Sequence, residues 1–341
     1  MENSTVNSLT LQLEGLSVSS SSRYPVFLLL LCSFVFILLA NAAIVGLILT
    51  QRSLRQPMYL LFCSLAANDV MGNALLVPRL LADVLLPPSQ RLIHFYECVV
   101  QAFATHLFCA NSHTVLMVMA FDRYVAICRP LRYASIMTDR RVVQLTAGAW
   151  GAGLVLVGVL LGLTLRLNRC RTLIANPYCD NASLFKLSCD DAAVANVYGL
   201  AYTGLLLSSS AACIVLTYSK IAAACVSSSS RRLSGWARTT CRARTTCSSH
   251  LCVYVLMLLS GLVFVVLHRF PQHAELRKTA AILFHTVPGS LNPVIYGLQS
   301  KEIHRLFSGT LKTKKSLTRK PQISQTLLWL NWWFCSHTAL G

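Results

Sequence analysis

The chain has 341 residues, of which 55% are hydrophobic and only 12% are charged. Its mean hydropathy is +0.56, whereas an ordinary soluble domain carries about 25% charged residues, so the composition excludes a typical water-soluble fold. The 30 Lys and Arg outnumber the 12 Asp and Glu, which gives a formal net charge of +18, and the positions of these charges carry information about topology.

Residues 1–24 precede the first long apolar stretch and are predicted to form an extracellular N-terminus, with a glycosylation sequon at Asn3. That stretch is longer than the core of a signal peptide, which spans about 7–15 residues, and no small-residue cleavage site follows it. We therefore expect it to remain in the mature protein as a membrane span.

Seven apolar stretches are each long enough to cross a bilayer, which takes about 20 mostly apolar residues. Only the second contains formal charges, at Asp69 and Arg79. The stretches are continuous rather than alternating, which favours helices over a membrane barrel. We therefore predict an all-α fold, a seven-transmembrane helix bundle. The predicted spans are 25–50, 58–82, 98–120, 142–165, 193–219, 248–267 and 279–298.

Basic residues gather on one side of the predicted membrane. If the N-terminus is outside, the cytoplasmic segments are 51–57, 122–141, 220–247 and the chain after 299, and they hold 20 of the 30 Lys and Arg. This distribution agrees with the positive-inside rule. We therefore predict a multi-pass plasma-membrane protein with an extracellular N-terminus, a lipid bilayer as its surroundings and no nucleic-acid partner.

Four of the 14 cysteines fall on the predicted outer face, at Cys98, Cys170, Cys179 and Cys189. Four cysteines allow three connectivities, and the sequence alone does not choose among them. The other ten lie in the membrane or the cytosol, where we expect reduced thiols. A second glycosylation sequon, at Asn181, lies in the same predicted outer loop as three of the four.

Short motifs lie at or near the ends of the predicted spans. On its own, the pair Asp122 and Arg123 would be read as a charge pair at a helix end. It does not stand alone. The motifs read PMYL at 57–60, LAAND at 65–69, MAFDRYVAIC at 119–128, RARTTCSSH at 242–250 and NPVIY at 292–296. Together they resemble the odorant receptors, a branch of the rhodopsin-like G-protein-coupled receptors, over residues 24 to 307.

The resemblance implies an activation switch at the cytoplasmic ends of the helices. In the family, the arginine of the Asp-Arg-Tyr motif is held by its neighbouring carboxylate at rest and is released to meet the G protein. A charge-assisted pair is suited to this because it can bias two packings and still break. The corresponding residues are Asp122, Arg123, Tyr124, Tyr218, Asn292, Pro293 and Tyr296. The hydroxyls of Tyr218 and Tyr296 are expected to rearrange around Arg123.

Asp69 is the only carboxylate well inside a predicted span, and an ionisable group at that depth is a functional candidate. The resemblance places it in a polar pocket with Asn41, Ser112 and Asn292 that holds water and sometimes sodium. The alternative is a neutral, protonated Asp69 that joins helices by hydrogen bonds. No cofactor and no metal other than this sodium ion is predicted.

The resemblance also implies the disulfides Cys98–Cys179 and Cys170–Cys189, and a ligand site between spans three, five, six and seven. The positions that would face the ligand are Thr105, His106, Cys109, Tyr202, Leu206, Val265 and His285. An apolar cavity with a few polar groups suits a small organic molecule. The outer half of span three has no acid to pair with a biogenic amine, and span seven has no lysine for retinal.

We therefore predict an odorant receptor that binds a small organic odorant and activates a heterotrimeric G protein of the olfactory, stimulatory type to raise cyclic AMP. The main alternative is a receptor of the same fold for a non-odorant small molecule. A transporter is disfavoured because the spans do not repeat. No enzyme activity is predicted, since the sequence has no phosphate loop and no nucleophile elbow.

Several segments depart from the family pattern. The block 237–242 is repeated in part at 243–248, and we expect the third cytoplasmic loop to be longer as a result. Leu258 stands where many odorant receptors have an aromatic residue. Beyond the bundle at 25–298, we predict an amphipathic helix at 299–310 and a basic cytoplasmic tail at 311–341 with a Trp-rich end. That end is either an interfacial anchor or the product of translation past the true end.

Overall fold

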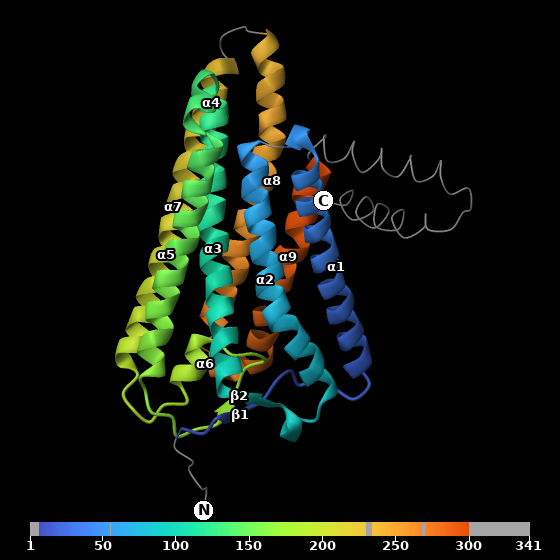
Figure 1. Ribbon diagram of the computed structural model, residues 1–341, viewed down its shortest axis with the longest axis vertical. Helices are drawn as coiled ribbons and strands as arrows, with labels where there is room; N and C mark the ends of the chain where they lie inside the picture. The colour runs from blue at the N-terminus through green and yellow to red at the C-terminus, as the bar shows by residue number, and fades with distance from the viewer. Residues whose placement is uncertain (1–6, 55, 230–233, 268–269, 300–341) are drawn as a thin grey trace, which may run out of the picture. The chain divides into compact units, whose positions relative to one another are not determined.

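The computed structural model describes residues 7–54, 56–229, 234–267 and 270–299. The described residues up to 297 form one compact unit, in which seven long helices run side by side (Figure 1). These helices are α1 (Arg23–Thr50), α2 (Pro57–Leu85), α3 (Phe95–Cys128), α5 (Asp139–Leu165), α7 (Ala193–Ser229), α8 (Ser234–Leu267) and α9 (Ala274–Gln299). The predicted all-α helix bundle is confirmed. The predicted helix at 299–310, except for its first residue, and the predicted tail at 311–341 lie outside the described residues.

Five helices in the described ranges are long and apolar enough to cross a membrane: α1, α2, α5, Ala193–Val226 of α7 and His250–Leu267 of α8. The helices α3 and α9 carry more polar residues, such as Asn111 and His113 on α3 and His285 on α9. These side chains are buried. A helix that is surrounded by other helices can carry polar groups that bond across the bundle instead of facing lipid.

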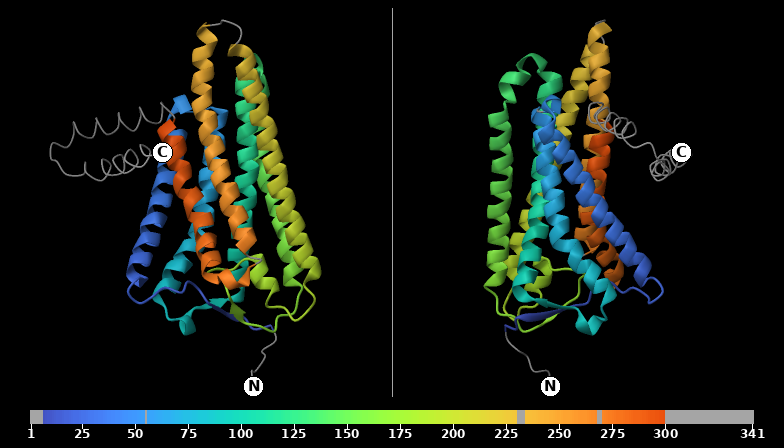
Figure 2. Two further views of the ribbon diagram at one scale, coloured as in Figure 1. Left: turned by 180° about the vertical axis from the view of Figure 1, so that it is seen from behind. Right: turned by 45° about the vertical axis from the view of Figure 1, so that its right-hand side comes forward.

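α3 is the central helix, because it packs against α2, α5, α7 and α8 (Figure 2). α3 and α2 approach closely at Gly72, where a Cβ atom would lie 2.7 Å from the ring of Phe108. The absence of a side chain at Gly72 therefore lets the two helices come together. Two short helices complete the described set, α4 (Tyr133–Ile136) and α6 (Asn181–Phe185).

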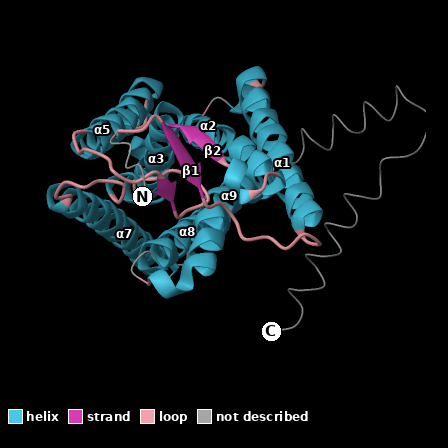
Figure 3. Ribbon diagram, turned by 90° about the horizontal axis from the view of Figure 1, so that it is seen from below, coloured by secondary structure: helices cyan, strands magenta, loops and turns pink. Residues whose placement is uncertain are grey.

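A small three-stranded sheet covers one end of the bundle, which we call the capped end (Figure 3). β1 (Thr10–Leu13) lies between β2 (Leu92–His94), to which it is antiparallel, and β3 (Leu173–Ile174), to which it is parallel. The sequence did not predict these strands. Leu11 and Leu13 of β1 are buried in the same core as Cys98 and Cys179, so the N-terminal segment contributes to the packing of the bundle.

The other end of the bundle differs from the sequence-based expectation in its helix lengths. α7 continues to Ser229, ten residues beyond the predicted end at 219, and α8 begins at Ser234. The repeated block 237–248, which is expected to lengthen the third cytoplasmic loop, is helical and lies within α8, before its membrane-spanning part His250–Leu267. The block consists of Ala, Arg, Thr, Cys and Ser residues and contains no Pro or Gly, so nothing in it interrupts a helix.

Candidate functional site

The Asp-Arg-Tyr motif lies at the end of α3 away from the sheet, which we call the motif end. The Asp122 side chain is fully buried, and its Oδ2 accepts a hydrogen bond from Nε of Arg123 at 3.0 Å. The Tyr133 hydroxyl, on α4, donates to Oδ1 of Asp122 at 2.8 Å. Burial and the negative charge of Asp122 raise the pKa of Tyr133, so Tyr133 remains a donor. Both carboxylate oxygens are thus engaged, and Arg123 is held against its own helix.

Near the same end, Tyr218 on α7 and His250 on α8 join their helices. The Tyr218 hydroxyl lies 2.7 Å from Nδ1 of His250, and the two rings are stacked. Tyr218 therefore pairs with a histidine rather than with the arginine of the motif. Tyr124 has the Lys220 ammonium 5.9 Å from its ring centroid, within the reach of a cation–π contact. The backbone of Tyr296 belongs to α9, but its side chain lies outside the described part of the chain.

A hydrogen-bonded group that the sequence did not reveal connects α3, α7 and α8. The Ser210 hydroxyl lies 3.2 Å from Nδ1 of His113 and 2.9 Å from the Tyr254 hydroxyl, and the His113 and Tyr254 rings meet edge to face. All three residues are buried. The only sequence signal was the presence of polar residues within three apolar spans, which is too general to indicate a shared contact.

The predicted polar pocket is partly assembled around Asp69. The Asn292 amide donates to Oδ2 of Asp69 at 2.8 Å and so joins α9 to α2 immediately before Pro293. The Asn41 amide instead donates to the carbonyl of Gly289 at 3.1 Å. Asn41 therefore joins α1 to α9 one turn of helix closer to the capped end than Pro293.

Ser112 does not contact Asp69 by a hydrogen bond. Its hydroxyl accepts from the Asn68 amide at 2.8 Å and donates to the carbonyl of Phe108 at 2.8 Å. Four buried oxygens of this region have no hydrogen-bond partner among the described residues. They are the Oδ1 atoms of Asn68, Asp69, Asn73 and Asn292. Carboxylate and amide oxygens suit a hard cation or ordered water, so these residues fit either occupant.

The positions predicted to face a ligand lie on α3, α7, α8 and α9. Tyr202 and Leu206 pack with the core around Cys179. His106 accepts a hydrogen bond at Nε2 from the backbone of Asn181 at 3.2 Å, and the Thr105 hydroxyl donates to the carbonyl of residue 101 on its own helix. The remaining two positions on α3 and α8 are partly buried: Cys109 and Val265.

His285 is the most enclosed of these residues. Its Nδ1 donates to the carbonyl of Ala281 at 3.0 Å, which makes Nε2 the acceptor nitrogen of the neutral ring. Nε2 has no partner in the described part of the chain. Phe108 stacks on the ring at 5.1 Å and Tyr178 meets it edge to face at 5.3 Å. Tyr178 comes from the loop between α5 and α7, and no sequence motif includes it.

The structure contains the two disulfides that the resemblance implies. Cys98 at the start of α3 is bonded to Cys179 in the loop between α5 and α7, and Cys170 is bonded to Cys189 within that loop. The Cys179 backbone N–H also donates to the Gln101 side chain at 2.8 Å. The loop is therefore attached to α3 by both a covalent bond and a hydrogen bond.

Glycosylation at Asn181 does not fit this fold. Asn181 is only 3% exposed, and its side-chain oxygen accepts a hydrogen bond from the Thr164 hydroxyl at 2.7 Å. A glycan on the Asn181 amide would have to occupy the space of the packed helices. The other predicted glycosylation site, Asn3, lies outside the described residues.

Residues 14–18, which we call the strap, connect β1 to α9 by charged and polar contacts. Lys278 is fully buried, and its ammonium donates to Glu14 at 2.8 Å and to Glu275 at 2.9 Å. The Ser17 hydroxyl donates to Glu275 at 2.9 Å. Burial raises the pKa of Glu275, but the hydrogen bonds from Lys278 and Ser17 lower it by more than burial raises it. The pKa of Glu275 is therefore below its ordinary value. The strap is thus held by an ionised carboxylate.

Comparison with known proteins agrees with this architecture. The family model described as "Olfactory receptor" matches residues 30–314. Human olfactory receptor 52P1 is 35% identical over 79% of this chain and 82% of its own length. Human olfactory receptor 4E1 is 33% identical over 86% of this chain and 90% of its own, and human olfactory receptor 10H1 is 33% identical over 89% and 93%. The chain therefore belongs to the olfactory receptor family, which consists of multi-pass, seven-transmembrane receptors rather than enzymes.

Proposed function

We propose that the chain is an odorant receptor of the plasma membrane, with the capped end outside and the motif end in the cytosol. A small organic odorant binds in the capped half of the bundle, and a heterotrimeric G protein of the olfactory, stimulatory type couples at the motif end and raises cyclic AMP. The observation that carries this proposal is the pair of buried Asp122 and partly buried Arg123, with its Tyr133 contact, because it is a charge pair that a partner at that end can open.

At rest, three contacts hold the motif end. Asp122 and Tyr133 keep Arg123 against α3, and Tyr218 and His250 keep α7 against α8. When α8 moves away from α7, the Tyr218 hydroxyl loses its histidine partner and is free to meet Arg123. The group of His113, Ser210 and Tyr254 joins α3, α7 and α8 in mid-membrane, so its hydrogen bonds change when α8 moves.

His285 indicates which ligands the capped half favours. The unpartnered Nε2 is an acceptor, and it is enclosed by aromatic rings. An odorant with a hydrogen-bond donor, such as an alcohol, satisfies this acceptor, whereas a simple ketone or ester does not. His106 accepts a backbone hydrogen bond at Nε2, so its donating nitrogen is Nδ1.

The ligand acts by shifting a population of conformations. An odorant that binds the open packing more tightly than the resting one favours release of Arg123. A shift from 1:99 to 99:1 requires a differential affinity of about 5.5 kcal/mol. A weaker agonist therefore gives a partial response.

In the pocket around Asp69, two occupants remain as alternatives in this proposal. A sodium ion would take the unpartnered oxygens of Asp69 and its asparagine neighbours, or a protonated Asp69 would donate to one of them. Sodium would make the odorant response of the wild type, but not of Asp69→Asn, depend on sodium concentration. A response of the wild type that is independent of sodium supports the protonated form.

The function is tested with a cyclic-AMP assay in cells that express the chain, screened against a panel of small odorants that includes matched alcohols and ketones. Arg123→Ala is expected to abolish the response while surface expression is kept. Arg166→Ala, which removes an exposed arginine at the capped end, is the matched control. A response that survives Arg123→Ala would contradict the proposed coupling.

A further inference from the structure

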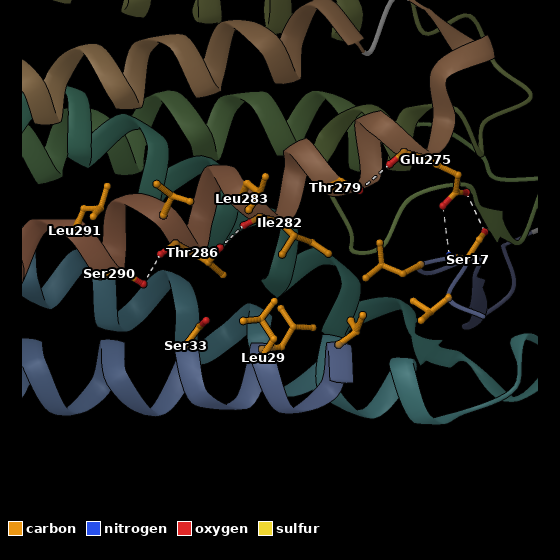
Figure 4. Close-up of a pocket in the computed structure, with 15 residues that line it drawn as sticks. Ser17, Leu29, Ser33, Glu275, Thr279, Ile282, Leu283, Thr286, Ser290 and Leu291 are labelled. Carbon is orange, nitrogen blue, oxygen red and sulfur yellow. Dashed lines mark hydrogen bonds between the residues drawn. The ribbon is translucent and has the colours of Figure 1, made fainter. Parts of the chain in front are cut away.

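A groove lies between α1 and α9 near the capped end, away from the predicted odorant site (Figure 4). Its volume is about 660 Å³, which lies in the range of about 300–1,000 Å³ that is usual for small-molecule sites. Leu16, Ser17 and Val18 of the strap close one end of it. None of the residues predicted to contact an odorant lines this groove.

The groove exists because α1 and α9 separate from one another toward the cap. The two helices are joined by the bond from Asn41 to Gly289, and from there toward the capped end their axes diverge (Figures 1 and 2). Leu29 and Leu283, on the two walls, are 68% and 48% exposed. In a bilayer these side chains face lipid, so the groove opens sideways into the membrane rather than into water.

Polar groups gather at the end of the groove that is nearest the cap. Glu275, Ser17 and Thr279 line this end, whereas the walls are mostly Leu, Ile and Val. An ionised carboxylate has about four acceptor positions. Ser17 and Lys278 use only part of this capacity, so Glu275 is able to accept a further hydrogen bond.

The charge of Glu275 selects the kind of molecule that fits. A phosphate or carboxylate head group would be repelled by it, which disfavours phospholipids and fatty acids. A neutral hydroxyl head donates to it with the strength of a charge-assisted bond. A rigid apolar body is favoured over a flexible chain because it loses less conformational freedom when it binds.

We propose that the groove between α1 and α9 binds a neutral membrane sterol, with its ring system between the two helices and its hydroxyl donating to Glu275. This inference does not depend on the identity of the odorant or of the G protein. It also does not depend on which side of the membrane the cap faces, since it concerns only the leaflet on the capped side.

The experiment uses the full-length receptor in lipid nanodiscs with a photoactivatable cholesterol probe, and the labelled peptides are mapped by mass spectrometry. Labelling is expected on α1 and α9 around Ser33 and Ile282, both of which line the groove. Excess cholesterol is expected to compete with the probe about tenfold better than cholestenone, whose ketone cannot donate, because a hydrogen bond to a charged group contributes about 1.5 kcal/mol.

Two variants test the geometry. Ser33→Phe fills the groove and is expected to abolish labelling, while Cys32→Phe, at the exposed neighbouring position that does not line the groove, leaves it unchanged. Glu275→Gln removes the charge and is expected to remove the preference for cholesterol over cholestenone. If Ser33→Phe fails to fold, the Glu275→Gln variant and the competition with cholestenone still test whether a sterol hydroxyl donates to Glu275.

Three results would overturn the proposal. One is labelling of this groove by a photoactivatable phospholipid that cholesterol does not displace. Another is equal labelling of Ser33→Phe and Cys32→Phe, both folded. The third is equal competition by cholesterol and cholestenone in the wild-type receptor.

Discussion

Asp122 and Lys278 are both fully buried, at opposite ends of the bundle, and each is held by groups of opposite charge. Removing a charge from water is costly, and the partner recovers that cost only while the pair is intact. The two sites differ in what surrounds them. Asp122 has a neighbour on its own helix and a hydroxyl from α4, whereas Lys278 depends on two carboxylates that are themselves largely exposed.

The contact from Tyr133 to Asp122 gives a prediction for basal signalling. Tyr133→Phe removes a hydrogen bond to a charged group, which contributes about 1.5–3 kcal/mol, and so weakens the resting arrangement around Arg123. We expect ligand-independent cyclic AMP, normalised to surface expression, to rise about tenfold. Tyr198→Phe, which removes an exposed hydroxyl bonded to Leu156 on α5, is the matched control. Unchanged basal signalling in Tyr133→Phe would show that this bond does not restrain the switch.

The ion pairs of Lys278 predict a non-additive effect on stability. Glu14→Gln or Glu275→Gln alone leaves the buried ammonium with one carboxylate, so each single change is expected to be mild. The double variant leaves the buried ammonium of Lys278 without a carboxylate and is expected to lower the free energy of unfolding by about 3–5 kcal/mol. The thermal unfolding midpoint of the purified receptor measures this, with Glu97→Gln, an exposed acid on α3, as control. Adding Lys278→Met should restore the midpoint, and purely additive single effects would argue against the pairing.

At the scale of the elements, the close contacts between helices depend on small residues. A Cβ on Gly72 would lie 2.7 Å from the Phe108 ring, and one on Gly289 would lie 2.8 Å from the Asn73 amide. The first contact sets the spacing of α2 and α3, and the second sets that of α2 and α9. In contrast, a Cβ on Gly158 of α5 would meet nothing within 4 Å.

Gly72→Ala and Gly158→Ala therefore form a matched pair with opposite expectations. At Gly72 the added methyl group forces α2 and α3 apart, and overpacking of this kind costs about 1–3 kcal/mol. At Gly158 the methyl group has open space and raises helix propensity by up to about 1 kcal/mol. Thermal unfolding in the same lipid discs should give a lower midpoint for the first variant and an equal or higher one for the second. The reverse order would contradict the packing of α2 against α3.

The strap gives a prediction about pH. The pKa of Glu275 is lowered from its ordinary value of 4.5 in the folded state, so the carboxylate binds its proton less readily when folded than when unfolded. Its contribution to stability is therefore complete above about pH 4.5 and is lost as the pH falls through the lowered pKa. We expect the wild type to unfold at a higher temperature than Glu275→Gln at pH 7, with the difference closing only below pH 4.5. A difference in unfolding temperature that disappears between pH 7 and pH 5 would indicate that a group other than Glu275 titrates.

At the scale of the whole molecule, the parts predicted from sequence are those with strong local signals. Long apolar runs predict the helices because a bilayer allows few other structures. The Asp122–Arg123 pair was also predictable, because the two residues are adjacent in the chain. The parts that were not predicted join distant segments: β1 with β2 and β3, Tyr133 with Asp122, and the strap with α9. The alternation of buried and exposed residues in β1 spans only four positions, too few to indicate a strand or to name its partners.

The sheet at the capped end makes the two disulfides unequal in their expected effects. Cys98–Cys179 closes a segment of 81 residues and Cys170–Cys189 one of 19, and chain-entropy arguments give the longer closure about 1 kcal/mol more stabilisation. Cys98 and Cys179 also lie in the core that receives Leu11 and Leu13, so their loss disturbs the sheet as well. We expect Cys98→Ser to abolish surface expression and Cys170→Ser to reduce it only partly, measured by antibody staining of an N-terminal tag. Equal losses would contradict the larger stabilising role expected for Cys98–Cys179.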